Sequence, residues 1–222
     1  MRSDVAIVIP VFNEAGMIAE VVAEVMKVFP NVICVDDGSI DDSGMIATKA
    51  GAKTFFHPMN LGQGAALQTG IEAAISLSHI KYIVTFDADG QHSVSDALAM
   101  VERLRVGDVE VVFGSRFLDE RTEVGTLKKL VLKVAVFYTN ALSGVKLTDA
   151  HNGLRAFTRN VAEHIELTHN GMAHATEIVN QISRGKFKYT EMPVHIVYTE
   201  YSKAKGQSLW NSVNILFDLI FR

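Results

Sequence analysis

The 222-residue chain has a single cysteine and no long apolar run. Cys34 lies inside the apolar stretch 32–35, so no disulfide can form within the chain, and a buried thiol favours a reducing compartment. No stretch reaches the roughly 18 consecutive apolar residues of a membrane-spanning helix. The N-terminus leads directly into a strand-like run without the pattern of a signal peptide. We therefore expect a cytoplasmic protein, and a peripheral position on the inner face of the cell membrane stays open.

The chain also has no excess of positive charge. The formal net charge is −4 and the sequence pI is near 6.1, which argues against nucleic acid as a partner. Hydrophobic residues make up 48% of the chain and charged residues 21%, which is the balance of a soluble globular protein. A chain of this length can form one α/β domain with a sizeable core and is marginal for two. We therefore expect a single domain over residues 1–222.

Short β-branched runs alternate with helical patterns in the first half of the chain. The runs that predict strands are 5–9, 32–35, 53–56, 82–86 and 109–113. The expected helix starts are Asn13, Asp41 or Asp42, the residue after Gly62, and Ser93, with Asp96 completing a capping box. Strands that alternate with helices pair in parallel and are covered on both faces. The sequence therefore predicts an α/β fold with a Rossmann-like, mostly parallel sheet and helices on both faces. After Arg116 the pattern changes to longer helices and a hairpin of residues 187–189 and 194–198.

Polar side chains follow four of the predicted strands. They are Asn13 and Glu14, Asp36 and Asp37, Asp87 and Asp89, and Ser115 and Arg116. Each pair alone is typical of an ordinary turn. In open parallel sheets, however, ligands bind beyond the carboxyl ends of the strands, and these ends share one edge. Four such clusters on one edge predict a ligand site.

Asp87 and Asp89 are separated by one residue at a strand end, so both carboxylates can face one cation. Mg²⁺ and Mn²⁺ prefer oxygen ligands and often bridge to substrate phosphates. Gln91 or His92 can add a ligand or a hydrogen bond. The chain has no grouping of Cys and His that suggests zinc. The acidic turn 87–92 therefore predicts a magnesium or manganese site.

A glycine-rich stretch at 60–70 opens a helix, where backbone N–H groups favour anions. It lacks the Gly-Lys-Ser/Thr ending of a Walker loop and the fixed spacing of a dinucleotide fingerprint. Contact with a phosphate or sugar and close packing of a helix start on the sheet are both open.

Five ordered motifs in the first 116 residues resemble those of family 2 glycosyltransferases with the GT-A fold. They are VIPVFNE at 8–14, VDDGS at 35–39 with Asp41, NLGQG at 60–64, DADGQ at 87–91 and GSR at 114–116. The resemblance is strongest to the polyprenyl-phosphate branch, typified by dolichyl-phosphate mannose synthase, and to related enzymes of bacterial surface-polysaccharide assembly. The second half is less uniformly similar, through residues 148–157, 172–177 and 201–208.

The resemblance implies an inverting glycosyltransferase that uses a UDP- or GDP-sugar donor and Mg²⁺ or Mn²⁺ in cell-surface polysaccharide assembly. Residues 1–116 would bind the nucleotide sugar and residues 117–222 the acceptor. The implied donor contacts are Pro10, Asn13, Glu14, Asn60 and Gly62, with Asp36 or Asp37 reading the base. Asp87 would lie near the ribose or the metal, Asp89 would hold the metal, and Gln91 would support it.

The resemblance leaves open whether the acceptor is a polyprenyl phosphate or a glycan. Arg116 and the metal would stabilise charge on the leaving diphosphate. A hydroxyl acceptor needs a general base, for which Asp149 is the first candidate and Glu177 and His151 are alternates. A phosphate monoester is already largely dianionic at neutral pH and needs cations instead. The residues expected at the acceptor are Arg116, Lys128, Lys129, Arg155 and Glu177.

Two later segments predict contact with other surfaces. Residues 127–137 form a helix with three lysines beside an apolar surface, which suits either an anionic lipid surface or the protein core. The apolar stripe at 209–220 suits the body of the protein, a second subunit or a membrane interface. Residues 203–207 suit a segment that closes over the donor, or a solvated loop.

Two other functions are weighed against a glycosyltransferase. A nucleotidyltransferase that makes nucleotide sugars usually carries a Gly-rich, basic signature after the first strand, where this chain has residues 11–14 (VFNE). A catalytically silent binding partner is disfavoured by the intact set of Asp87, Asp89 and Asp149.

Overall fold

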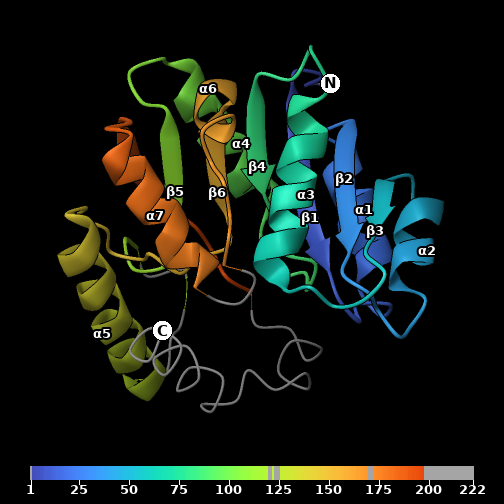
Figure 1. Cartoon of the computed structure of the whole chain (residues 1–222), viewed down its shortest axis with the longest axis horizontal. Helices are drawn as coiled ribbons and strands as arrows, with labels where there is room; N and C mark the ends of the chain where they lie inside the picture. Colours follow the sequence, from blue (N-terminus) through green and yellow to red (C-terminus); the bar gives the residue numbers. More distant parts are fainter. Residues whose placement is uncertain (1, 120–121, 123–125, 170–172, 198–222) are drawn as a thin grey trace.

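The computed structural model describes residues 2–119, 122, 126–169 and 173–197 and contains one seven-stranded sheet (Figure 1). The strands are β1 (Val5–Val11), β2 (Asn31–Asp36), β3 (Lys53–Phe56), β4 (Tyr82–Thr85), β5 (Val111–Ser115), β6 (Arg155–Thr158) and β7 (Tyr189–Pro193). The helices are α1 (Ile18–Met26), α2 (Ser43–Lys49), α3 (Gln63–Ile75), α4 (Val94–Arg105), α5 (Thr126–Ser143), α6 (Arg159–Ala162) and α7 (His174–Arg184). All five strands predicted in the first half are present, within two residues at each end.

The sheet is mostly parallel, as predicted. Its order is β3-β2-β1-β4-β6-β5-β7, and β1 pairs in parallel with β2 and β4. β2–β3 and β5–β7 are also parallel, whereas β6 runs antiparallel to both β4 and β5. The start of β6 therefore lies at the edge where β4 and β5 end. This strand was not predicted, and it carries the segment before it, residues 149–154, to the expected ligand edge.

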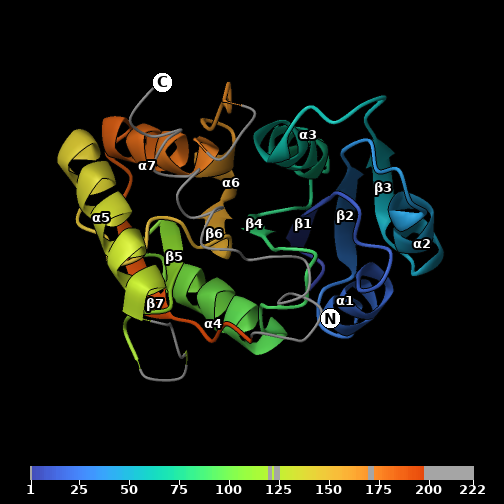
Figure 2. The ribbon, with the colours of Figure 1, turned by 90° about the horizontal axis from the view of Figure 1, so that it is seen from below.

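Helices cover both faces of the sheet, as predicted. Figure 2 shows α1 and α4 on one face and α3, α6 and α7 on the other. The sequence of β1 is a continuous apolar run because both faces of the strand are buried. Val5, Ile7 and Ile9 pack in the core on one side of the sheet, and Ala6 and Val8 pack in the core on the other side. A strand buried on both faces has no polar side to alternate with.

Cys34 is buried in β2, as expected from its apolar surroundings. Burial, with a smaller effect of the negative charge of Asp36, raises the pKa of the Cys34 thiol to about 12. The thiol is therefore protonated at neutral pH and packs as a small core side chain.

The predicted hairpin of residues 187–189 and 194–198 is wrong. β7 pairs in parallel with β5 instead of turning back on itself. The chain after β7 crosses to the acidic turn, where Val197 N donates to Gln91 O at 3.0 Å and Ile196 forms a β-bridge with His92. Apolar alternation identified residues suited to extended structure but could not identify their partners.

Two of the predicted helix caps also need correction. Ser93 caps α4 by accepting from Ser95 N, as predicted, but Asp96 accepts from His195 N at 2.8 Å instead of completing a capping box. Asn13 does not cap α1, which begins five residues later at Ile18. The predicted surfaces at 203–207 and 209–220 lie outside the described residues. Within the described ranges, no helix has the length and apolar character needed to cross a membrane.

We predict that Phe157→Ala, in the centre of β6, lowers the free energy of unfolding by about 3–5 kcal/mol. Phe157 has no exposed surface and packs in the core beneath α3 and α7. Phe137→Ala on α5 is the matched control, because that ring is 75% exposed and such surface changes stay within about 0.5 kcal/mol. Urea unfolding of both variants measures the difference, and equal losses would contradict the central position of β6.

Candidate active site

A cavity of about 370 Å³ opens at the carboxyl edge of the sheet. Its volume lies in the range of small-molecule sites. It is lined by Pro10, Val11, Phe12, Glu14, Asp37, Asn60, Gln63, Ala66, Asp87, Ala88 and Asp89. These residues come from the ends of β1, β2 and β4 and from the start of α3. The structure thus brings together the polar residues that follow three different strands.

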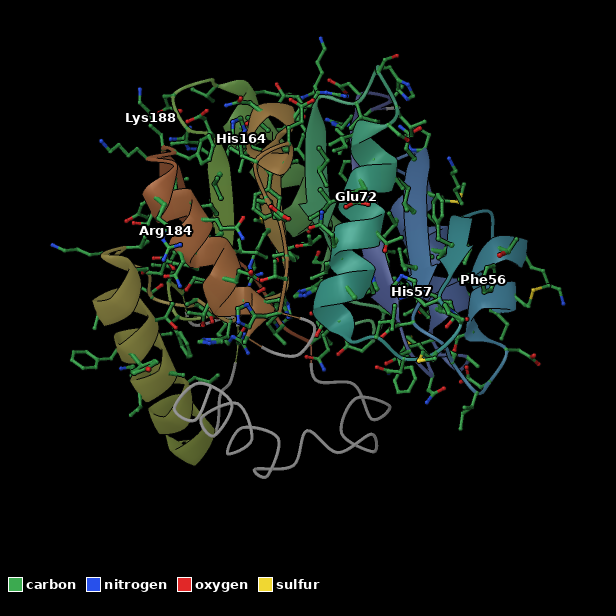
Figure 3. The ribbon with its side chains drawn as sticks, viewed as in Figure 1. Phe56, His57, Glu72, His164, Arg184 and Lys188 are labelled. Atoms are coloured by element: carbon green, nitrogen blue, oxygen red, sulfur yellow. The ribbon has the colours of Figure 1, made fainter. Side chains whose placement is uncertain are left out.

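Asp37 shapes the wall formed by the loop before α3. Its Oδ1 accepts from Leu61 N at 2.9 Å, and its Oδ2 accepts from Gly62 N at 2.7 Å. His57, labelled in Figure 3, places Nδ1 at 2.7 Å from Asp37 Oδ1 and Nε2 at 3.0 Å from Thr69 of α3. Gly62 needs its left-handed φ of 101° to present this N–H. The glycine-rich stretch is therefore fixed on Asp37.

Asn13 and Asp36 join the loops after β1 and β2. Asn13 has a left-handed backbone, φ 55°, and its Oδ1 accepts from Ile40 N at 2.9 Å. Asp36 Oδ1 accepts from Ser39 N at 2.9 Å, and Ser39 Oγ accepts from Asn13 N at 3.0 Å. Of the two carboxylates expected to read a base, only Asp37 lines the cavity.

Asp87 is held between a histidine and a glycine. Its Oδ2 lies 2.8 Å from His92 Nε2, and a Cβ on Gly153 would lie 2.2 Å from the same oxygen. Burial raises the pKa of Asp87. The charge and hydrogen bond of His92, together with the charges of Arg155 and His174, lower this pKa by more than burial raises it. The pKa therefore stays below its usual value, and Asp87 is ionised at neutral pH.

Asp89 is buried beside the negative charge of Asp87. Burial, followed by the charge of Asp87, raises the pKa of Asp89 to about 6. Its Oδ1 accepts from Gln91 N at 3.1 Å, and among the described residues Oδ2 has no hydrogen-bond partner. A divalent cation supplies the missing positive charge at such a pair. The oxygen ligands of Asp87 and Asp89 therefore fit Mg²⁺ or Mn²⁺.

The protein ligands alone are too few to enclose a metal. In the part of the chain that the structure describes, no three His, Cys, Asp or Glu side chains group closely enough to hold one. Gln91 is buried, and its Nε2 has no hydrogen-bond partner among the described residues. Mg²⁺ and Mn²⁺ commonly complete their coordination with water and substrate phosphate. The site is suited to a metal that binds together with a phosphate ligand.

Arg116 and Asp149 form an ion pair on the other side of the edge. Arg116 Nε lies 2.6 Å from Asp149 Oδ2, and Arg116 N donates to the same oxygen at 3.2 Å. The Asp149 side chain has no exposed surface, and its Oδ1 has no hydrogen-bond partner among the described residues. Glu191 of β7 fixes this segment, because its carboxylate accepts from Thr148 N and Asp149 N. Asp149 is thus positioned to orient Arg116.

Arg155 and His151 are buried behind these groups. Arg155 was expected at the acceptor, but it is 2% exposed and donates through Nη2 to Ala150 O at 3.1 Å. Burial lowers its pKa to about 10 against the opposing charges of Asp87 and Asp149. Burial also lowers the pKa of His151 to about 4, which makes it a weak base at neutral pH.

The other residues expected at the acceptor are Glu177, Lys128 and Lys129. The Glu177 carboxylate accepts from Thr168 N and His169 N, so it fixes a loop. Burial raises the pKa of Glu177, but the hydrogen bonds from Thr168 and His169 hold it below its usual value. Lys128 and Lys129 fall in the first turn of α5, where the side chains are outside what the structure describes.

The sequence analysis gave three residues of the site no role or too small a role. His92 was considered only as a possible ligand or hydrogen-bonding group of the metal site, Gly153 was only part of a motif, and Glu191 gave no signal. The roles of Gly153 and Glu191 depend on β6 and β7, whose positions in the sheet the sequence did not reveal.

Known proteins resemble this chain in sequence and in fold. The sequence model of the glycosyl transferase family 2 matches residues 6–166. The chain belongs to glycosyl transferase family 2. It is therefore a glycosyltransferase, as the five motifs predicted. Membership of this family argues against the two other hypotheses, a nucleotidyltransferase and a catalytically silent binding partner.

Similar proteins support the same placement in the family. An uncharacterised protein of Methanocaldococcus jannaschii is 34% identical over 226 residues, covering 100% of this chain and 93% of that protein. UDP-N-acetylglucosamine–dolichyl-phosphate N-acetylglucosaminyltransferase of Methanococcus voltae is 29% identical, covering 96% of this chain and 94% of the enzyme. The predicted resemblance to dolichyl-phosphate glycosyltransferases is confirmed.

The fold is also that of solved glycosyltransferases. Glucosyl-3-phosphoglycerate synthase from Mycobacterium tuberculosis, crystallised with Mn²⁺, uridine diphosphate and phosphoglyceric acid, superposes with a TM-score of 0.70. The alignment covers 98% of this chain and 78% of that chain at 17% identity. The predicted GT-A fold is confirmed.

The buried His151 generates a pH-dependent prediction. Its folded pKa of about 4 lies below the usual value of 6.5, so the unfolded chain binds the extra proton between these pH values. Stability therefore rises with pH across this window, and about 3 kcal/mol is lost as the pH falls from 7 to 4. We expect His151→Phe to lack this part of the loss in urea unfolding. His79→Phe, at an exposed position, is the control, and parallel curves for wild type and His151→Phe would contradict the assignment.

Proposed function

We propose that this enzyme transfers a sugar, with inversion, from a UDP- or GDP-sugar to a polyprenyl phosphate, with Mg²⁺ or Mn²⁺ bound at Asp87 and Asp89. One observation carries the proposal. Asp89, whose pKa is raised by burial and by the charge of Asp87, lines the same cavity as Asp37 and the start of α3. Asp87, which is hydrogen-bonded to His92, lines this cavity as well. A divalent cation bound to a nucleoside diphosphate would balance the negative charge of these two carboxylates, and the diphosphate oxygens would complete the coordination of the cation.

The residues of the chain support each part of the transfer. Glu14, Asp37 and Asn60 line the cavity where the nucleoside would bind. The bound metal would neutralise the charge that develops on the departing diphosphate. An acceptor oxygen forms the new bond to the anomeric carbon from the opposite face, and the carbon–oxygen bond to the diphosphate breaks with its electron pair on the diphosphate. Arg116 lies at this edge and adds a fixed positive charge.

The pairing of Asp149 favours a phosphate over a hydroxyl acceptor. A hydroxyl group needs a base that can reach it, but the Asp149 side chain is fully buried and bonded to Arg116. Neither alternate base is suited to accept the hydroxyl proton. The Glu177 carboxylate accepts a hydrogen bond from His169 N, and the low pKa of His151, about 4, makes it a weak base. A phosphate monoester carries its own nucleophilic charge at neutral pH. The dolichyl-phosphate substrate in the name of the Methanococcus voltae enzyme supports this choice.

The proposal is tested with Asp89→Ala. Wild type is expected to gain thermal stability with a UDP- or GDP-sugar and Mn²⁺ and to transfer the sugar to polyprenyl phosphate. Asp89→Ala should bind Mn²⁺ poorly and lose at least about 10²-fold in kcat, because the charge stabilisation of the leaving group is removed. Thermal shift across a panel of nucleotide sugars and transfer of radiolabelled sugar provide the two measurements.

Asp108→Ala is the control, since Asp108 is an exposed carboxylate paired with Arg103, remote from the cavity. Full activity of Asp89→Ala would remove the metal assignment. Transfer to a glycan hydroxyl but not to polyprenyl phosphate would overturn the acceptor assignment and leave the donor site intact.

Exposed apolar side chains around the cavity support contact with a lipid surface. They follow β1, β2, β3, β5 and β7 at the same carboxyl edge and are Phe12, Ile40, Met59, Leu61, Leu118 and Val197. On α5, Val134 and Phe137 are exposed as well. A surface that meets lipid needs exposed apolar side chains, and a polyprenyl phosphate is embedded in a membrane. We therefore propose that this edge faces the membrane.

Ile40→Asp tests the membrane assignment, because Ile40 is 93% exposed at the carboxyl edge. We expect this variant to bind phosphatidylglycerol–phosphatidylcholine vesicles about tenfold more weakly, since burying an isoleucine side chain is worth about 1.5–3 kcal/mol. Val106→Asp is the matched control, because Val106 is 70% exposed where α4 ends, at the opposite edge. Co-sedimentation measures both variants. Equal binding by the two, or no binding by wild type, would refute the placement.

A further inference from the structure

We propose that His92 is a positioning residue that fixes Asp87 for donor binding through its Nε2–H alone. This inference rests on the proposed function, because it concerns how the chain prepares a carboxylate for a metal and a diphosphate. It assigns a separate task to a residue that lies outside the pair of carboxylates.

The hydrogen bond between the two side chains has only one possible direction. His92 Nε2 and Asp87 Oδ2 are 2.8 Å apart, and an ionised carboxylate can only accept. Nε2 therefore carries the proton in either charge state of the ring. Nδ1 is buried and has no hydrogen-bond partner among the described residues. Within that part of the chain, the bond to Asp87 is the only hydrogen bond of the ring.

Packing fixes the ring in the orientation that this bond needs. The His92 side chain is 3% exposed, and its ring meets the ring of Phe86 edge to face, with centroids 5.4 Å apart. The backbone of His92 is bridged to Ile196 in the segment after β7. A donor held by packing on several sides stays in place when its partner is loaded with a ligand.

Asp87 is restrained from the opposite side as well. A Cβ on Gly153 would lie 2.2 Å from Oδ2 and 2.5 Å from Oδ1, so the carboxylate lies directly against the glycine. Gly153 is itself fixed, because its carbonyl accepts from Thr85 Oγ1 at 2.6 Å. Oδ2 is bonded to His92, and Oδ1 accepts no hydrogen bond from the described residues. His92 thus commits one oxygen and leaves the other for a ligand.

A purely structural histidine would also be buried and packed, so the test must separate the Nε2–H bond from the packing. His92→Gln retains an Nε2–H donor at nearly the same reach from the backbone. His92→Asn places its amide one carbon shorter and loses the bond to Asp87, although both changes remove the ring. The comparison of the two variants therefore isolates the hydrogen bond.

The experiment measures Mn²⁺ binding in the presence of UDP and, separately, of GDP by electron paramagnetic resonance, with Tm recorded for each variant. We expect His92→Asn to weaken Mn²⁺ binding by about 10–100-fold, the usual effect of losing a group that orients a metal ligand. His92→Gln should stay within about threefold of wild type. The KM for the donor should rise in His92→Asn in the same proportion.

Each other result has a distinct meaning. Wild-type affinity in both variants would overturn the role of His92 and leave the proposed function standing. Equal losses of Mn²⁺ affinity and of Tm in both variants would assign His92 to packing and also overturn the inference. Failure of the wild-type protein to bind Mn²⁺ with either UDP or GDP would overturn the proposed function itself, and the inference with it.

Discussion

The antiparallel pairing of β4 with β6, from Tyr82 opposite Thr158 to Thr85 opposite Arg155, determines where the two halves of the site meet. Because β6 begins where β4 ends, residues just before β6 emerge beside Asp87. Gly153 packs on the Asp87 carboxylate, and Asp149 reaches Arg116 at the end of β5. A parallel β6 would carry this segment to the opposite edge of the sheet. Backbone hydrogen bonds in the core, more than surface loops, therefore join the acidic turn to the Arg116–Asp149 ion pair.

Charge is arranged around the same strand. Arg155 is buried at the start of β6, where its pKa of about 10 keeps it protonated at neutral pH. Burying a lone cation costs several kcal/mol, and the charges of Asp87 and Asp149 offset that cost. One cation thus compensates carboxylates on both sides of the site. The two sides are electrostatically coupled, so a change at either carboxylate alters the surroundings of the other.

Much of the first half could be predicted from the sequence, because apolar strands and helical spacing alternate regularly there. The edge that holds Asp37, Asp87 and Asp89 followed from the parallel pairing of those strands. β6 was missed because it is four residues long and begins with an arginine, a residue type that is seldom fully buried. Arg155 was expected at the acceptor because a phosphate acceptor needs cations, whereas the structure buries it. The partners of Glu191 depend on β7, and Gly153 reaches Asp87 only through β6, so local patterns could not reveal them.

The acidic turn is held in place from several directions. Met17 of the loop before α1 packs behind Gly90, where a Cβ would lie 3.0 Å from the methionine sulfur, and Val197 donates to the carbonyl of Gln91. These restraints keep Asp87 and Asp89 close together, although burial and, after it, the negative charge of Asp87 raise the pKa of Asp89 to about 6. A flexible turn would relax by moving the carboxylates apart. A rigid turn retains the repulsion in the fold and releases it when positive charge arrives, so part of the binding energy of a cation is prepared by the folding of the chain.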